Sequence, residues 1–172
     1  SIGKEEKDIV NKVMKSGKLS AFFGTWGEGF YGGEYVKKFE KDCSKYFKVK
    51  YALSVNSWTS GLIASVGALN INPGDEIIVS PWSMCATATA ILHWNAIPVF
   101  ADIEYDTYNL DPKEVIKKIN KRTKAIMAVD IFGHSSSINE LKKIANKYNL
   151  KIISDSAQSP GEKYNHNIAG TI

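Results

Sequence analysis

The sequence predicts an α/β fold with a mostly parallel sheet and helices on both faces. Short apolar runs alternate with amphipathic stretches over most of the chain, and turn or capping residues separate them. With 172 residues, of which 44% are hydrophobic, the chain is long enough to bury one core. Strand followed by helix, repeated, requires parallel pairing and right-handed crossovers, which place helices on both faces of the sheet.

Two amphipathic helices are expected before this alternation begins. Apolar side chains recur at helical spacing over Lys4–Lys15, which Gly17 ends, and again over Glu34–Phe47. Between them, Phe22–Tyr35 mixes glycines with aromatic residues and is expected to be an ordered loop. Its aromatics either contact another subunit or a ligand, or pack on their own domain. We expect residues 1–48 to form an N-terminal unit.

Residues 49–172 carry the alternation and are expected to form a second domain. The strands are predicted at Ala52–Val55, Ile77–Ser80, Ile97–Ala101, Ala125–Val129 and Lys151–Ser154. The helices are predicted at Thr59–Leu69, Ala86–Trp94, Pro112–Ile119 and Ile138–Tyr148. Pro73-Gly74-Asp75 forms a turn into a strand, and Asp111 caps a helix that has proline at its first position.

Composition and charge exclude several classes of protein. The net charge is +4, and the one basic cluster, over residues 117–124, is interpreted as a solvated helix end, so no nucleic-acid partner is expected. The two cysteines and three histidines match no ligand spacing, so no metal site is expected. Residues 1–11 are too charged for a signal peptide and no apolar stretch has the length of a membrane span. We expect a cytoplasmic protein without membrane contact.

Two polar clusters follow strands that a doubly wound sheet can bring to one rim, where ligands bind in such folds. Ser57, Thr59 and Ser60 open a predicted helix whose N–H groups can bind a phosphate, although these residues alone favour an ordinary N-cap. Asp155 and Gln158 follow the last predicted strand. A buried carboxylate there needs a cationic or N–H partner, unless Asp155 only caps a helix or a turn. Together, the clusters would hold a phosphate and a positive ring nitrogen.

Several common catalytic motifs are missing from the sequence. No Gly-x-Gly-x-x-Gly follows a strand, and no Gly-Lys-Ser/Thr, Gly-x-Ser-x-Gly or His-Glu-x-x-His occurs. Hydrolase and metalloenzyme functions therefore have no support, and nucleotide binding by a Rossmann domain is disfavoured.

A family resemblance joins the two clusters. The stretches that carry it include Pro73-Gly74-Asp75-Glu76-Ile77-Ile78, Ala86-Thr87-Ala88-Thr89-Ala90-Ile91-Leu92 and Asp155-Ser156-Ala157-Gln158. In order and spacing, the chain from about Phe39 onward resembles the DegT/StrS sugar aminotransferases, which are pyridoxal 5'-phosphate enzymes of the aspartate-aminotransferase fold type. The resemblance implies that the chain is the incomplete large domain of such an enzyme, with the small C-terminal domain absent.

The resemblance also implies roles for individual residues. Ser57, Trp58 and Thr59 would cradle the cofactor phosphate, and Asp155 would pair with the protonated pyridine nitrogen. Gln158 would lie near the phenolic oxygen, and Met84 occupies the position of a stacking aromatic ring. Two residues depart from the family pattern: Trp58 stands where the family commonly has glycine, and Met84 replaces the aromatic residue. A thioether packs well on a ring but stacks less well than an aromatic side chain.

The lysine that forms the Schiff base in the family lies beyond the aspartate motif. The resemblance places it beyond residue 172, so no catalytic residue is assigned within this chain, and the chain alone is expected to be inactive. Lys163 is the one lysine after Asp155, and it matches a variable turn position.

The resemblance implies transfer of an amino group from an amino acid such as glutamate to a keto sugar or keto cyclitol, in a homodimer. Two alternatives are a pyridoxal-phosphate sugar dehydratase of the same fold and a non-catalytic product that acts as an interaction partner.

Overall fold

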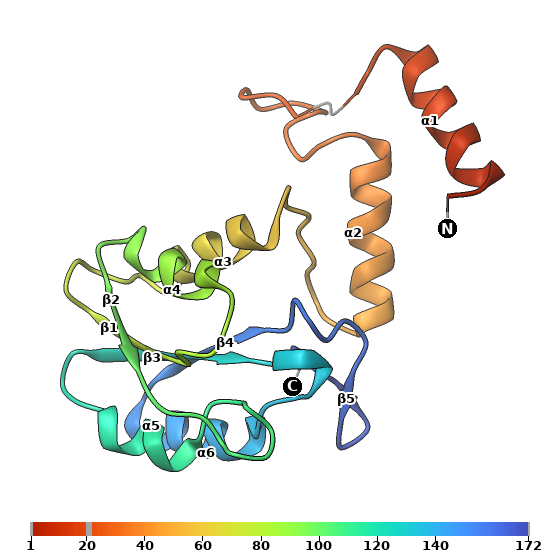
Figure 1. The fold of residues 1–172 in the computed structure, drawn as a ribbon. Coiled ribbons are helices and arrows are strands. Elements are labelled where there is room, and N and C mark those ends of the chain that lie inside the picture. Colours follow the sequence, from red (N-terminus) through yellow and green to blue (C-terminus); the bar gives the residue numbers. More distant parts are fainter. Residues whose placement is uncertain (1, 20–21, 172) are drawn as a thin grey trace. The chain divides into compact units, whose positions relative to one another are not determined.

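The structure, a computed structural model, describes residues 2–19 and 22–171. The chain divides into two compact units, Ser1–Ser54 and Val55–Ile172, which are described separately (Figure 1). The sequence-based domains 1–48 and 49–172 stay a prediction.

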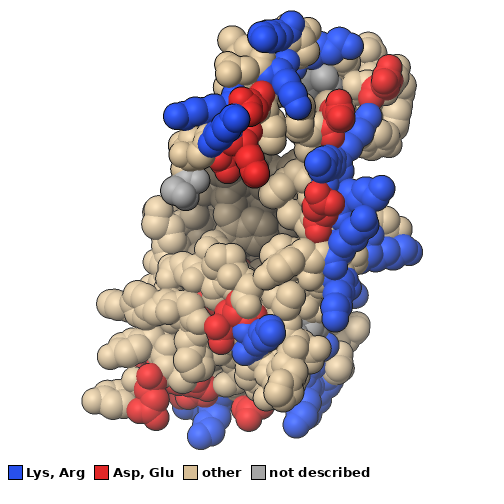
Figure 2. Space-filling model, turned by 90° about the vertical axis from the view of Figure 1, so that its right-hand side faces the viewer, with Lys and Arg blue, Asp and Glu red and all other residues tan. Residues whose placement is uncertain are grey.

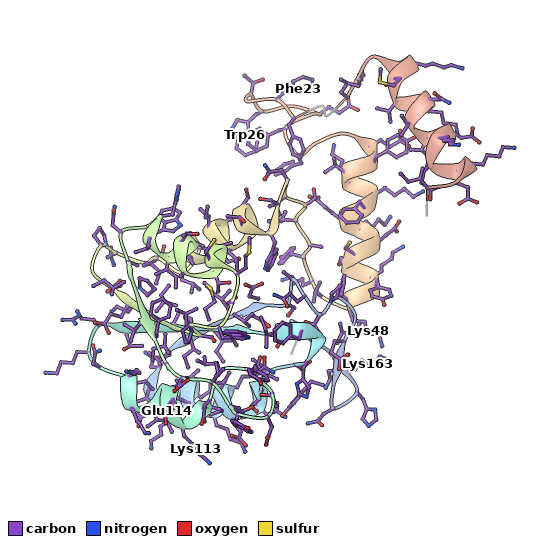
Figure 3. The ribbon with its side chains drawn as sticks, viewed as in Figure 1. Phe23, Trp26, Lys48, Lys113, Glu114 and Lys163 are labelled. Carbon is purple, nitrogen blue, oxygen red and sulfur yellow. The ribbon has the colours of Figure 1, made fainter. Side chains whose placement is uncertain are left out.

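The first unit contains two helices joined by an irregular loop. Helix α1 (Lys4–Ser16) ends at Gly17, whose left-handed backbone (φ 68°) closes the last turn, and α2 spans Glu34–Phe47. Both predicted helices are confirmed. Figure 3 places Phe23 and Trp26 in the loop between them. There the rings of Trp26 and Phe30 stack with centroids 4.1 Å apart, yet Trp26 is 79% exposed. The loop is therefore ordered by its own aromatic contacts while it still presents aromatic surface.

The second unit is a four-stranded parallel sheet between two pairs of helices (Figure 1). Strands β1 (Glu76–Val79), β2 (Ile97–Phe100), β3 (Thr123–Val129) and β4 (Lys151–Asp155) lie in the order β2-β1-β3-β4. Helices α3 (Trp58–Gly67) and α4 (Cys85–Leu92) cover one face, and α5 (Pro112–Lys118) and α6 (Ile138–Tyr148) cover the other. The predicted α/β class, with helices on both faces, is confirmed.

Alternation of side chains along the central strands separates two cores. Ile77 and Val79 of β1 pack under α3 and α4, whereas Ile78 between them packs against α5 and α6. In β3, Met127 belongs to the first core and Ile126 to the second. Because both faces of the sheet are covered, β1 and β3 are apolar along most of their length.

The predicted strand at Ala52–Val55 is wrong. A strand needs a hydrogen-bonded neighbour, and among the described residues none forms a ladder with this segment. Instead, the backbone N–H and the hydroxyl of Ser54 both donate to Glu40 Oε1, at 2.8 and 2.9 Å. Leu53 is 84% exposed. The hydrogen bonds of Ser54 therefore go to a side chain of α2 and not to a neighbouring strand.

A short antiparallel hairpin near the end of the chain was not predicted. Strands β5 (Lys163–Tyr164) and β6 (Asn167–Ile168) are joined by Asn165 and His166, which both have positive φ (47° and 68°). Two residues with positive φ make the tight turn whose twist matches a hairpin. A single 3₁₀ turn, Ile131–Gly133, follows β3 and was also not predicted.

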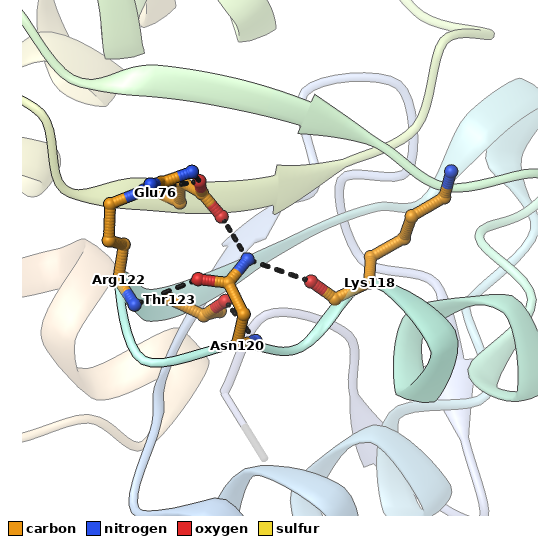
Figure 4. A network of polar contacts seen from close by, with 5 residues as sticks. All are labelled: Glu76, Lys118, Asn120, Arg122 and Thr123. Carbon is orange, nitrogen blue, oxygen red and sulfur yellow. Dashed lines mark hydrogen bonds and ion pairs between the residues drawn. The ribbon is translucent and has the colours of Figure 1, made fainter.

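A buried carboxylate at the amino end of β1 links this strand to the loop before β3 (Figure 4). Glu76 is 3% exposed, and it accepts hydrogen bonds from Arg122 Nε (2.8 Å) and Asn120 Nδ2 (2.6 Å). Burial alone would raise the pKa of Glu76, but the Asn120 and Arg122 hydrogen bonds and the Arg122 charge together lower the pKa below its usual value. The contacts tie the loop before β3 to β1.

We expect Glu76→Gln to destabilise the protein by roughly 1–3 kcal/mol at neutral pH, because it removes a buried charge whose partners remain. Since the folded-state pKa of Glu76 lies below its unfolded value, the ionised group stabilises the fold above the unfolded pKa. That contribution is lost as the pH falls through the folded-state pKa. The difference between variant and wild type, measured by urea denaturation, should therefore shrink as the pH is lowered below the usual pKa of a glutamate.

Glu114→Gln is the matched control, because Glu114 pairs with Lys117 at the surface of α5 and should change stability little at either pH. A Glu76→Gln effect of equal size at both pH values would contradict the electrostatic account.

Candidate functional site

A cavity of about 140 Å³ lies at the carboxyl ends of β3 and β4, in the second unit. Its walls come from the first turns of α3 and α4 and from the strand ends, and five of the six sequence-predicted cofactor residues line it: Trp58, Thr59, Met84, Asp155 and Gln158. The sixth, Ser57, directly precedes Trp58 as the N-cap of α3. The structure therefore brings the two polar clusters together, while their role in cofactor binding stays a prediction.

Asp155 is the last residue of β4 and is 5% exposed. The indole N–H of Trp58 donates to its Oδ1 (2.6 Å), and the hydroxyl of Thr87 donates to its Oδ2 (2.9 Å). A weaker turn contact from the Ala157 N–H, at 3.4 Å, corresponds to the alternative role of a turn aspartate. These donors are neutral groups, and the two carboxylate oxygens have lone pairs for a further donor.

Thr87 was missed as a site residue by the sequence reasoning. It lies on α4, 1% exposed, and its hydroxyl also bonds the hydroxyl of Ser83 at 2.8 Å. The available signal was its place in the quoted motif Ala86–Leu92, where a threonine stands among apolar residues of a helix that faces the sheet. Thr87 and Ser83 form a chain of hydroxyls that orients Asp155.

The amino terminus of α3 borders the same cavity. The Ser57 hydroxyl accepts from the N–H of Ser60 (3.2 Å), so the ordinary N-cap is realised in the structure. The N–H groups of the first turn have no partner within a helix, and the helix dipole favours an anion there. Ser57 caps the N–H of Ser60, and Trp58 and Thr59 of the same first turn line the cavity.

Gln158 and Met84 complete the predicted set. The side-chain oxygen of Gln158 accepts from the backbone N–H of Phe132 (3.0 Å), which leaves its NH₂ group as a donor. Met84 is the N-cap of α4 and is 67% exposed. Neither side chain is buried, so both can move on contact with a ligand.

A second buried carboxylate, Asp130, directly follows β3 and is hydrogen-bonded to the end of β4. Asp130, 2% exposed, accepts from the N–H and hydroxyl of Ser136 (2.8 and 2.6 Å) and from the hydroxyl of Ser156 (2.6 Å). Its own N–H donates to the Asp155 carbonyl (3.0 Å). The sequence reasoning did not identify this residue. Asp130 is satisfied by these donors and fixes the backbone on both sides of Asp155.

The other predicted features are found outside the cavity. Lys163 lies in β5 and is exposed (Figure 3). Members of the basic cluster pair with acidic side chains: Lys117 with Glu114, Arg122 with Glu76, and Lys124 with Asp75. On the face that Figure 2 shows, Lys and Arg side chains lie among Asp and Glu side chains, as is typical of a solvated surface.

Among residues 2–19 and 22–171, no three His, Cys, Asp or Glu side chains gather as a metal site would require. Over the same residues, none of the helices combines the length and apolar character needed to cross a membrane.

The sequence model of the DegT/DnrJ/EryC1/StrS aminotransferase family matches residues 1–172. A dTDP-3-amino-3,6-dideoxy-alpha-D-galactopyranose transaminase from Aneurinibacillus thermoaerophilus is 37% identical over 169 residues, which are 98% of this chain and 44% of that protein.

Solved structures agree with the fold. The X-ray structure of an aminotransferase from Psychrobacter cryohalolentis superposes with a TM-score of 0.86 at 29% identity, over 95% of this chain and 39% of that one. The structure of a GDP-4-keto-6-deoxymannose-3-dehydratase with a trapped PLP-glutamate geminal diamine gives a TM-score of 0.86 at 27% identity, over 99% of this chain and 43% of that one.

The chain spans less than half the length of each of these proteins. Its helices, its parallel sheet and its sequence over residues 1–172 match theirs, and the chain belongs to the DegT/DnrJ/EryC1/StrS aminotransferase family.

Proposed function

We propose that this chain is the cofactor-binding part of a pyridoxal-phosphate aminotransferase. The enzyme moves an amino group from an amino acid such as glutamate to a keto sugar or keto cyclitol. The observation that carries the proposal is the buried carboxylate of Asp155, which shares one cavity with the first residues of α3. The 37% identical relative is named as an amino-sugar transaminase, which supports the reaction class and a sugar as acceptor.

The residues present fit a phosphorylated pyridine. The carboxylate of Asp155 is 5% exposed, and its donors among the described residues are neutral, so it favours a charged N–H partner, because such a bond recovers part of its desolvation cost. First-turn N–H groups of α3, with the hydroxyls of Ser57 and Thr59, suit a phosphate dianion. The two groups line the same cavity or stand next to it, as the two ends of one cofactor require.

When bound, the cofactor supplies an electron sink for the carbon that loses its proton. Asp155 holds the proton on the ring nitrogen, through a charge-assisted bond worth roughly 1.5–3 kcal/mol. Thr87 keeps Asp155 in place, and Gln158, through its NH₂ group, and Met84, through its side chain, would hold the bound cofactor. The reactive lysine stays a prediction from the resemblance, which places it beyond residue 172.

A sugar dehydratase is the second candidate. One structural neighbour at 27% identity is a 3-dehydratase that acts on a GDP-4-keto sugar, and it matches 99% of this chain. A dehydratase would use Asp155 and the amino terminus of α3 in the same way. The choice between the two reactions depends on the residue at the position of the reactive lysine.

The proposal includes a homodimer in the cytoplasm. In the loop between α1 and α2, Phe23, Trp26 and Tyr31 are each more than half exposed, which favours contact with a second protein surface. Cys43 and Cys85 are both free, as is usual in a reducing compartment.

Replacement of Asp155 by asparagine tests the cofactor assignment. The amide has the same shape but cannot stabilise a positive ring nitrogen, so Asp155→Asn should weaken pyridoxal-phosphate binding by roughly ten- to a hundred-fold. It should also abolish transamination by the protein that carries this chain. Equilibrium dialysis gives the affinity, and the α-keto acid formed from glutamate gives the activity.

Asp106→Asn is the matched control, because Asp106 is exposed in a loop on the same unit and should leave both quantities unchanged. Equal cofactor affinity in Asp155→Asn and wild type would contradict the pairing of Asp155 with the ring nitrogen.

The dimer is tested by changing the aromatic loop. Trp26→Ser combined with Tyr31→Ser should shift sedimentation equilibrium toward monomer, because it removes aromatic surface that the proposal places in the interface. Tyr105→Ser, at a tyrosine that is 91% exposed in the second unit, should leave the equilibrium unchanged. A wild-type protein that is monomeric at micromolar concentration would contradict the dimer.

A further inference from the structure

The indole ring of Trp58 is held in place at two points. Its N–H donates to Asp155 Oδ1 at 2.6 Å. Its six-membered ring lies on Gly61, one turn along α3, so closely that a Cβ on Gly61 would come within 2.7 Å of Trp58 Cε3. The absence of a side chain at Gly61 therefore makes room for the indole, and the carboxylate of Asp155 fixes its direction.

Trp94, which follows α4 in the chain, makes a comparable contact with α3. Its ring lies on Gly67 in the same manner, and its N–H donates to the carbonyl of Ile63 at 2.7 Å. There the acceptor is a backbone carbonyl in the middle of α3, so the contact serves packing. The acceptor of Trp58 is instead a buried carboxylate in the wall of the candidate site.

The cavity beside Asp155 is small for a cofactor. Its volume of about 140 Å³ is below the roughly 300–1,000 Å³ of ordinary ligand sites. Trp58 forms one wall, and it is 43% exposed, so its side chain has open space into which it can rotate. Rotation of this one side chain would enlarge the cavity directly over the Asp155 carboxylate.

The indole also presents the same kind of donor as a protonated pyridine, because both are flat aromatic rings with an N–H in the ring plane. A carboxylate oxygen accepts two hydrogen bonds, so the two rings do not compete for lone pairs. The indole of Trp58 occupies the position next to Asp155 Oδ1 from which a pyridine N–H would approach the same oxygen.

We propose that Trp58 is a stand-in donor, which pairs with Asp155 while the site is empty and rotates away when the pyridine ring of the cofactor enters. This inference rests on the proposed function, since it takes pyridoxal phosphate as the ligand. The Trp58–Asp155 hydrogen bond must break on binding, so it lowers cofactor affinity. Trp58→Phe keeps an aromatic ring but removes the N–H donor, and it should tighten cofactor binding roughly ten-fold.

The direct test is the solvent exchange of the indole N–H groups in the full chain, measured by NMR on protein with ¹⁵N-labelled tryptophan. The chain has four tryptophans, and the Trp58→Phe and Trp94→Phe variants assign the two resonances of interest. In the free protein, both N–H groups should exchange slowly, because both are hydrogen-bonded. After addition of pyridoxal phosphate, the Trp58 N–H should exchange quickly, while the Trp94 N–H stays protected.

A second variant moves the indole without removing it. The Cβ of Gly61→Ala would strike the Trp58 ring, so the Trp58 N–H should exchange quickly even without cofactor. Cofactor affinity in Gly61→Ala should then rise as it does in Trp58→Phe. Trp94→Phe is the control for affinity, and it should bind the cofactor like wild type.

The outcomes separate the inference from the proposed function. Cofactor binding with the Trp58 N–H still protected overturns the stand-in role and leaves the proposed function standing. Fast exchange of the Trp58 N–H in the free protein also overturns the stand-in role. Failure of pyridoxal phosphate to bind to wild type, Trp58→Phe and Gly61→Ala alike overturns the proposed function, and the inference with it.

Discussion

The candidate site is arranged around one buried carboxylate, which needs hydrogen-bond donors to be stable. Asp155 ends a parallel strand with 5% of its surface exposed, where an unpaired charge would cost several kcal/mol. The structure meets this need from two helices, with Trp58 at the start of α3 and Thr87 within α4. The carboxylate therefore connects β4 to both helices that cover one face of the sheet.

The two ends of the sheet have different roles. At the amino end of β1, Glu76 is paired with an arginine and an amide, and these partners hold the loop before β3 in place. At the carboxyl ends of β3 and β4, the donors to Asp130 and Asp155 from the described part of the chain are neutral, and a cavity lies beside Asp155. A fully paired charge stabilises the fold, whereas a carboxylate with spare acceptor capacity beside a cavity can bind a ligand.

Much of the fold could be predicted from the sequence, because its elements have strong local patterns. Helices α2 and α6 begin and end at the predicted residues, and the four strands of the parallel sheet all coincide with predicted apolar runs. The error at Ala52–Val55 has a non-local cause: β propensity is not enough without a neighbouring strand, and Ser54 bonds Glu40 of α2 instead. The β5–β6 hairpin was missed because a two-residue turn without glycine gives a weak signal.

The candidate site could be predicted in part. Parallel topology alone brings strand ends to one rim, so the convergence of the α3 amino terminus with Asp155 followed from the order of the elements. The partners of Asp155 could not be predicted, because they depend on side-chain directions across 97 and 68 residues of sequence. The role of Trp58 was hidden for the same reason, since the sequence showed only a bulky residue where the family has glycine.

The central claim is that Asp155 keeps the ring nitrogen of pyridoxal phosphate protonated. The most direct measurement is the ¹⁵N chemical shift of that nitrogen in ring-labelled cofactor bound to the protein, recorded at neutral and at mildly alkaline pH. The account predicts the shift of a protonated pyridine at both pH values. The shift of a neutral pyridine in the bound cofactor would contradict it.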